Sequence, residues 1–115
     1  MWARVLRKTP SSRLLLKSIQ YLDQSIGESV IQSFKARGIG PEFIKLEVVE
    51  VREKYFKAYN RVDIALDPFP FNGGTVSVEG LWMGVPVLTL AGNSLVSRQG
   101  AGIVMNAGLS DWIAD

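Results

Sequence analysis

The chain has 115 residues, with 13 Lys and Arg, 11 Asp and Glu, and neither histidine nor cysteine. This length suits one domain with one core, and 47% hydrophobic with 21% charged residues is typical of a globular protein, not a disordered one. The lack of cysteine excludes disulfides and thiol chemistry, and the lack of histidine removes the commonest metal ligand and general base. Any chemistry must therefore rest on carboxylates, Lys and Arg, tyrosines, hydroxyls and the backbone.

The sequence predicts binding neither to a membrane nor to nucleic acid. No apolar run approaches the roughly 20 residues of a membrane span, and residues 1–13 lack the apolar segment of a signal peptide. Residues 1–61 hold 12 of the 13 basic residues against 6 acidic ones, but without a basic run or interleaved aromatic residues. A solvated surface is therefore the preferred interpretation over a nucleic-acid interface. The missing cysteines fit a reducing compartment, so we expect a cytoplasmic protein.

Helical and strand patterns alternate along the chain. The predicted helices cover residues 2–8, 25–38, 51–60, 75–84 and 97–107. The predicted strands cover residues 13–17, 43–49, 63–67 and 87–90, and residues 109–113 are expected to form a terminal turn. This alternation predicts an α/β fold with a parallel sheet and helices on both faces. The chain begins inside a helix and ends soon after Trp112, so we expect one lobe of a larger protein, cut at both ends.

Two helices have predicted ends or faces. Ser25 and Glu28 have the spacing of a capping box, and Gly38 is expected to cap the C-terminus of that helix. In the helix at residues 51–60, Phe56 and Tyr59 are expected on the inner side.

Residues 63–90 form the most informative segment, with the pattern strand, glycine loop, helix, strand. Pro68 and Pro70 end the first strand, and residues 72–74, Asn-Gly-Gly, form a turn before a helix that begins at Thr75. Ligands bind at this end of the strands in open α/β sheets, and a helix N-terminus there favours an anion such as phosphate. The loop matches neither the GxGxxG fingerprint nor a P-loop. On pattern alone, a tight turn without a ligand is an equally good interpretation.

Other residues of this half have structural interpretations. Asp63 and Asp67 bracket a strand, where side chains four residues apart lie about 13 Å apart; we interpret them as residues that fix loops, not as a catalytic or metal-binding pair. Trp82 and Met83 are expected in the core. Arg98 either faces a binding cleft or pairs with an acid.

The segment from Asp63 to Arg98 closely resembles the C-terminal lobe of the O-linked N-acetylglucosamine transferase and SPINDLY family. The matching positions are Asp63, Leu66, Asp67, Pro70, Asn72, Gly73, Thr75, Glu79, Leu81, Trp82, Gly84, Pro86, Thr89, Ser97 and Arg98. Residues 2–17 also resemble the family's helix, proline and first strand. The resemblance therefore extends over nearly the whole chain.

The resemblance implies a glycosyltransferase of the GT-B type, with two Rossmann-like lobes. Residues 1–115 would be the nucleotide-sugar-binding C-terminal lobe, which usually holds UDP-N-acetylglucosamine and needs no metal ion or other cofactor. The parent enzyme would transfer the sugar from UDP to a Ser or Thr hydroxyl of a protein. The acceptor would be positioned by the missing N-terminal lobe and by the helical TPR repeats ahead of it. The isolated lobe is expected to be inactive, and the sequence assigns it no catalytic residue.

The resemblance also suggests which residues hold the nucleotide sugar. Thr75 and the glycine loop, with the N–H groups of Gly74 to Val76, would hold the diphosphate, and Gly73 belongs to the same turn. Glu79 follows Thr75 by one helical turn on the same face, where its carboxylate can accept both ribose hydroxyls. The alternative for Glu79 is a favourable acid in the first helical turn.

Arg52 and Tyr55 complete the predicted site. The family has a lysine and, three positions on, a histidine near the diphosphate and base. Arg52 can replace the lysine, although a surface charge is an equal alternative, whereas Tyr55 carries no charge at neutral pH. Val76 stands where the family often has a second threonine. These departures leave two alternatives open: a degenerate, non-catalytic nucleotide-binding or assembly module, and a lobe like that of a sugar-nucleotide epimerase.

Overall fold

The computed structural model describes residues 1–115, which divide into two compact units, Met1–Val51 and Arg52–Asp115. Each unit has its own parallel sheet, with strand order β1-β2 in the first and β3-β4-β5 in the second. The predicted α/β class with parallel strands is confirmed. The strands pair in two sheets, whereas the sequence pattern predicted one. No helix combines the length and apolar character that crossing a bilayer requires.

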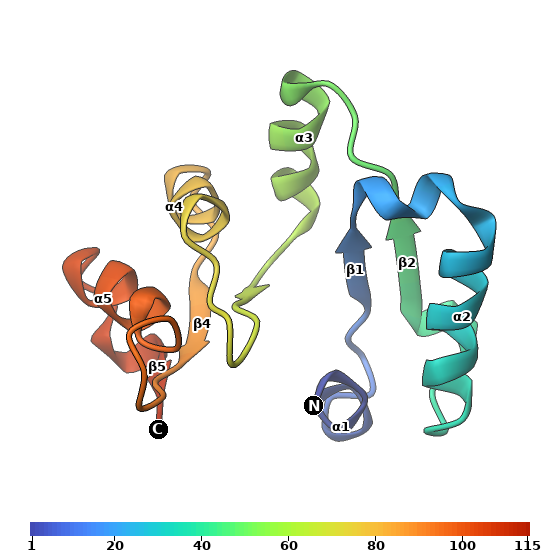
Figure 1. The fold of residues 1–115 in the computed structure, drawn as a ribbon, viewed down its shortest axis with the longest axis horizontal. Coiled ribbons are helices and arrows are strands. Elements are labelled where there is room, and N and C mark those ends of the chain that lie inside the picture. Colours follow the sequence, from blue (N-terminus) through green and yellow to red (C-terminus); the bar gives the residue numbers. More distant parts are fainter. The chain divides into compact units, whose positions relative to one another are not determined.

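The first unit holds two helices, two strands and two short 3-10 turns. The elements are α1 (Trp2–Lys8), β1 (Leu14–Lys17), a 3-10 turn at Ile19–Leu22, α2 (Gln24–Lys35), a second such turn at Pro41–Phe43, and β2 (Ile44–Glu47). The two strands run in the same direction, with Leu14 opposite Ile44 and Leu16 opposite Leu46 (Figure 1). Their apolar side chains pack with those of both helices around a core of Ala3, Leu6, Phe34, Ile39 and Ile44.

Helix α2 begins earlier than the sequence pattern predicted. Asp23 is the N-cap, and its Oδ1 accepts the backbone N–H of Ser25 at 2.9 Å. The predicted capping box of Ser25 and Glu28 is therefore wrong, because Ser25 already lies inside the helix and Glu28 accepts a hydrogen bond from Gln24 instead. The predicted end at Gly38 is close, since the helix ends at Lys35 and Gly38 adopts a φ of 76°.

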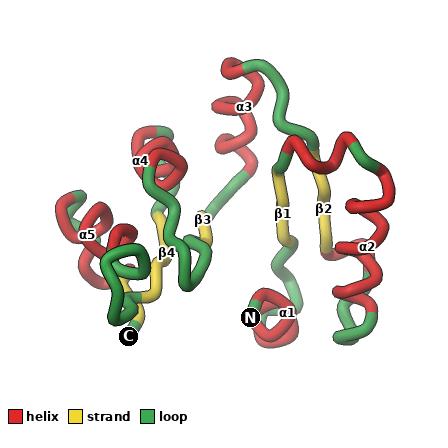
Figure 2. The backbone as a smooth tube through the Cα atoms, viewed as in Figure 1, coloured by secondary structure: helices red, strands yellow, loops and turns green.

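The second unit alternates helices and strands from α3 onward (Figure 2). The elements are α3 (Arg52–Ala58), a 3-10 turn at Tyr59–Arg61, β3 (Ala65–Leu66), α4 (Thr75–Trp82), β4 (Val87–Leu90), α5 (Gln99–Asn106), a 3-10 turn at Ser110–Trp112, and β5 (Ile113–Ala114). The predicted start of α4 at Thr75 and both bounds of β4 are confirmed. The predicted terminal turn at residues 109–113 instead leads into β5, which pairs with β4 through Thr89 opposite Ile113.

Helix α4 packs closely against β4. A Cβ at Gly80 would lie 3.5 Å from Val87 Cγ2 and from Tyr59 Cε1, which is ordinary van der Waals contact, so alanine would fit and a longer side chain would have to displace these neighbours. Ser77 and Gly80 share the buried face. Trp82 follows Gly80 by two positions, which is more than half a turn around the helix, and it is 85% exposed. The prediction that Trp82 lies in the core is therefore wrong, while Met83 is half-buried.

The turn from α4 into β4 depends on Gly84. Its φ of 81° reverses the chain, and the N–H of the next residue, Val85, bonds to the Gly80 carbonyl at 2.9 Å. This C-terminal motif favours glycine because other residues adopt such a φ at a cost. It fixes the length of α4, and so the position of its first turn relative to the sheet.

Candidate functional site

The loop between β3 and α4 is anchored by the buried carboxylate of Asp67. Its Oδ1 accepts the N–H of Gly73 at 2.6 Å, and its Oδ2 accepts the hydroxyl of Thr89 at 2.7 Å. Asp67 is only 5% exposed, so these donors replace the water it gives up. The interpretation of Asp67 as a residue that fixes a loop is confirmed, whereas Asp63 is exposed.

Asn72 ties the same loop to α5. This side chain is 1% exposed; its Nδ2 donates to the Pro68 carbonyl at 2.9 Å and its Oδ1 accepts the N–H of Gly100 at 3.3 Å. The Ser77 hydroxyl donates to the Gly73 carbonyl at 3.0 Å. Hydrogen bonds to Asp67 and Ser77 on one side and to α5 on the other therefore fix the loop in one conformation, and this conformation sets where α4 begins.

The first turn of α4 offers unpaired backbone donors. The N–H groups of Gly74, Thr75, Val76 and Ser77 have no acceptor within the chain, and the N-cap, Gly74, makes no side-chain cap. Thr75 and Val76 are exposed, so their donors are open to solvent, whereas Ser77 is buried. Gly73 differs, because Asp67 already accepts its N–H. Four free N–H groups at a helix N-terminus can accommodate an anion.

A second group of polar side chains, the Glu79 cluster (Arg52, Tyr55, Tyr59 and Glu79), joins α4 to α3 and the turn after it. The Tyr55 hydroxyl donates to Glu79 Oε2 at 3.1 Å and lies 3.0 Å from the Tyr59 hydroxyl. Arg52 Nη2 lies 3.8 Å from Glu79 Oε1, with side-chain exposures of 80% for Arg52 and 16% for Glu79. An ion pair with so exposed a partner contributes little. Tyr55 is therefore the stronger restraint on the carboxylate.

Burial keeps both phenols of this cluster protonated. Desolvation raises the pKa of Tyr55 well above the ordinary tyrosine value, and the hydrogen bond to Tyr59 and the nearby Glu79 carboxylate add to this. Burial likewise raises the pKa of Tyr59. Tyr55 therefore remains a hydrogen-bond donor to Glu79 across the physiological pH range.

The structure brings the seven predicted site residues together in the second unit. Arg52 and Tyr55 contact Glu79, while residues 73–76 form the loop end and first turn of the same helix. Tyr59 links the two groups, since its hydroxyl lies 3.4 Å from the Val76 carbonyl. Whether these residues bind a nucleotide sugar stays a prediction.

Two neighbours of the site were missed in the sequence. Tyr59 was expected on the inner side of its helix but not as a partner of Tyr55, although their spacing of four residues indicates it. Gln99 lies beside Gly74, where an added Cβ would come within 2.8 Å of its Nε2. Arg98, whose role the sequence left open, donates from Nη1 to the Gly92 carbonyl at 3.1 Å.

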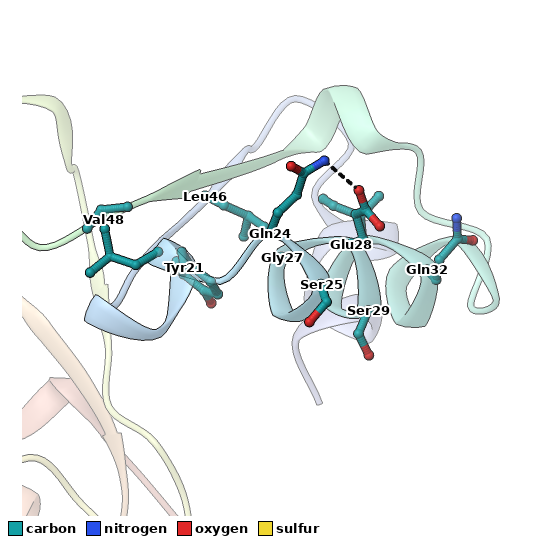
Figure 3. Close-up of a pocket in the computed structure, with 11 residues that line it drawn as sticks. Tyr21, Gln24, Ser25, Gly27, Glu28, Ser29, Gln32, Leu46 and Val48 are labelled. Carbon is teal, nitrogen blue, oxygen red and sulfur yellow. Dashed lines mark hydrogen bonds between the residues drawn. The ribbon is translucent and has the colours of Figure 1, made fainter.

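The surface also has two hollows, the second of which is lined in part by Gln99. One, of about 730 Å³, lies in the first unit along α2 and β2, where Gln24 and Glu28 are hydrogen-bonded at 2.8 Å (Figure 3). Its polar side chains are mostly exposed, and they do not converge on one point. The other, of about 660 Å³, lies between α4 and α5 beside Trp82. Neither hollow contains a predicted site residue, and we place the candidate site on the donor geometry of α4 instead.

No group of three or more Asp or Glu side chains is arranged to hold a metal ion. Asp67 is occupied by two donors, and Glu79 lies beside Arg52 and Tyr55. The polar groups of this unit are thus arranged to offer N–H and cationic donors beside one carboxylate.

Comparison with known proteins shows the family and the fold of this chain. The model of glycosyl transferase family 41 matches residues 1–115. The chain belongs to glycosyl transferase family 41. An O-GlcNAc transferase mutant from Thermobaculum terrenum has a similar structure, with a TM-score of 0.95 and 34% identity over 98% of this chain and 22% of that chain. The expected fold, the C-terminal lobe of a GT-B enzyme, is confirmed by this match.

Curated relatives of this family-41 chain include plant and animal proteins. A probable UDP-N-acetylglucosamine–peptide N-acetylglucosaminyltransferase SPINDLY from Arabidopsis thaliana is 31% identical over 99% of this chain and 13% of that protein. The corresponding protein from Solanum lycopersicum is 30% identical over 99% of this chain and 12% of its own length. A UDP-N-acetylglucosamine–peptide N-acetylglucosaminyltransferase from Caenorhabditis elegans is also 30% identical. The chain spans only about an eighth of the length of the plant relatives.

Proposed function

We propose that this chain is the donor-binding lobe of a protein O-glycosyltransferase that uses UDP-N-acetylglucosamine. The observation that carries the proposal is the set of free N–H groups of residues 74–77, one helical turn ahead of the Glu79 carboxylate. Support also comes from the relatives, whose names describe transfer of N-acetylglucosamine from UDP to a peptide.

In this proposal the two groups of residues bind different parts of the donor. The first turn of α4 holds the diphosphate, where N–H dipoles stabilise the charge that develops on the leaving UDP. Glu79 accepts hydrogen bonds from the ribose hydroxyls, and Arg52 adds positive charge. The Ser or Thr acceptor is positioned by parts of a parent protein outside residues 1–115.

A second candidate is a degenerate lobe that no longer binds the donor well and serves assembly. One observation favours it: the Tyr55 hydroxyl already occupies one oxygen of Glu79. This candidate predicts that UDP does not bind at α4 even at several millimolar, so one titration separates it from the first proposal.

The test is a titration of the isotope-labelled chain with UDP, followed by the amide signals. We expect the largest shifts at residues 74–79 and a dissociation constant in the millimolar range, about −4 kcal/mol, because the site is open to water. Shifts confined to residues 13–37, near the hollow of Figure 3, would overturn the assignment.

A matched pair of loop variants sharpens the test. In Gly73→Ala the added Cβ would lie 2.8 Å from Ser77 Oγ and 3.3 Å from Asp67 Oδ1, both of which are buried and hydrogen-bonded. In Gly74→Ala it would meet only the flexible, exposed amide of Gln99. We expect the first variant to weaken UDP binding at least about tenfold more than the second.

A further inference from the structure

Tyr55 and Tyr59 form a chain of hydroxyls that ends on the Glu79 carboxylate. Their rings meet edge to face, with centroids 5.6 Å apart and planes at 90°. Each phenol has one proton to donate. Tyr55 gives its proton to Glu79 Oε2, so only Tyr59 can donate across the 3.0 Å contact between the phenols; the Tyr59 hydroxyl also donates to the Val76 carbonyl at 3.4 Å. The proton of Tyr55 therefore points toward Glu79, while that of Tyr59 is shared between the Tyr55 hydroxyl and the Val76 carbonyl.

This pair of hydroxyls restrains one oxygen of the Glu79 carboxylate, and both carboxylate oxygens can still accept further hydrogen bonds. A carboxylate has about four lone-pair sites. Tyr55 uses one of them, on Oε2, and Arg52 is 3.8 Å from Oε1 without a close hydrogen bond. Glu79 can thus still accept two hydroxyl donors, one on each oxygen, while its rotation is fixed by the phenol.

We propose that Tyr55 is a positioning residue that sets the preference of the site for a ribose over a deoxyribose nucleotide by orienting Glu79. The inference rests on the proposed function, because it takes Glu79 to be the residue that meets the sugar hydroxyls. Two neighbouring hydroxyls can both bind only when the carboxylate has one particular orientation. A freely rotating carboxylate, by contrast, can adjust to bind a single hydroxyl. A fixed carboxylate therefore favours the vicinal diol.

The family resemblance placed residue 55 near the diphosphate and base, whereas the structure places its hydroxyl on the predicted ribose acceptor. A tyrosine serves this second role because its hydroxyl, with its raised pKa, donates a hydrogen bond to the carboxylate across the physiological pH range. The Tyr55 ring also makes an edge-to-face contact with the Phe56 ring, with centroids 5.5 Å apart, and this second contact further restrains Tyr55.

The test compares the affinities of UDP and 2′-deoxy-UDP for the parent and the variants Tyr55→Phe, Tyr59→Phe and Glu79→Gln, measured by amide-signal titration. The parent should prefer UDP by about tenfold, the worth of one hydrogen bond to a charged group. Tyr55→Phe keeps the ring and should reduce this ratio to about threefold or less, with the affinity for 2′-deoxy-UDP changed less than about twofold. Tyr59→Phe leaves the contact between Tyr55 and Glu79 in place and should keep the ratio within about twofold of the parent.

The outcomes separate the inference from the proposed function. If Glu79→Gln leaves the ratio unchanged, Glu79 does not meet the ribose, and that part of the proposed function fails. If Glu79→Gln abolishes the preference for UDP over 2′-deoxy-UDP but Tyr55→Phe retains it, only the positioning role fails. Equal loss of both nucleotides in Tyr55→Phe, or an equal drop of the ratio in Tyr59→Phe, would also overturn the inference, because either would indicate a merely structural role.

Discussion

The carboxylate of Asp67 accepts a hydrogen bond from the N–H of Gly73 at 2.6 Å, across the loop that leads into α4. The other carboxylate oxygen accepts a hydrogen bond from the hydroxyl of Thr89 on β4 at 2.7 Å. One buried side chain thus connects the end of β3, the glycine loop and the next strand. Because the loop is fixed in this way, the free N–H groups of α4 are oriented before any ligand arrives, which reduces the entropy lost on binding.

Replacing Asp67 tests how much the loop depends on this carboxylate. Asp67→Ala leaves the half-buried Gly73 N–H and the buried Thr89 hydroxyl without their acceptor, which should lower the free energy of unfolding by about 2–4 kcal/mol. Asp67→Asn should cost clearly less, since its amide oxygen can still accept from Gly73 and the Thr89 hydroxyl can turn to accept from the amide. Urea unfolding followed through the amide signals of residues 65–90 measures both.

The control for this pair is Asp63→Ala, on the exposed side of the same segment, which should change the free energy of unfolding by less than about 0.5 kcal/mol. Equal losses in Asp67→Ala and Asp67→Asn would show that Asp67 contributes through its charge and not through the two hydrogen bonds.

Two glycines of α5 should respond to alanine in opposite directions. A Cβ at Gly100 would collide with the Asp67 carboxylate, so Gly100→Ala should destabilise the second unit by about 1–3 kcal/mol. A Cβ at Gly102 would meet nothing within 4 Å, so Gly102→Ala should stabilise the helix by about 0.5–1 kcal/mol. Thermal unfolding of the two variants checks the signs. A neutral Gly100→Ala would mean that α5 can move away from the loop at little cost.

Local features of the fold could be predicted from the sequence because they depend on nearby residues. The apolar run at residues 87–90 and the turn residues before Thr75 set β4 and the start of α4 correctly. The cap of α2 was wrong because Asp23 and Ser25 are both good N-cap residues, and the choice between them depends on the preceding turn. Strand β5 has only two residues, too few for a periodic signal.

Features that depend on tertiary pairing could not be predicted. The grouping of strands into two sheets depends on which strands meet, and the apolar pattern of each strand does not specify this. The exposure of Trp82 follows from which face of α4 meets β4, and Gly80, not the larger side chain, marks that face. The contact between Tyr55 and Glu79 joins residues 24 positions apart on different helices, so no local spacing indicates it.

Removing metal ions should leave UDP binding unchanged within about threefold. The predicted diphosphate contacts are N–H groups and Arg52, and Asp67 and Glu79 already have donors or cations beside them. The measurement is the UDP affinity with added Mg²⁺ and with EDTA. Since UDP itself binds Mg²⁺, the affinity of Gly73→Ala under both conditions serves as the reference. A parent that loses more than about tenfold, or 1.4 kcal/mol, on addition of EDTA would show that the diphosphate site has been misassigned.

A histidine at position 55 should make UDP binding depend on pH. The resemblance to the family places an imidazole where this chain has a phenol. Burial lowers the pKa of an imidazole at this position and the neighbouring Glu79 raises it, so Tyr55→His carries more positive charge at pH 6 than at pH 8. The phenol of the parent, with its raised pKa, stays neutral at both pH 6 and pH 8. We expect Tyr55→His to bind UDP about three- to tenfold more tightly than the parent at pH 6, with a smaller gain at pH 8.

Because the phosphate of UDP titrates near pH 6, the two proteins are compared at each pH by calorimetry, so that the change in the ligand cancels. Asn60→His introduces an imidazole at an exposed position in the turn after α3, where no hydrogen bond to Glu79 is present, and should show no gain. An equal affinity of Tyr55→His and the parent at both pH values would mean that residue 55 does not face the diphosphate. The alignment of α3 with the family's basic segment would then be wrong, while the role of Tyr55 toward Glu79 would stand on its own test.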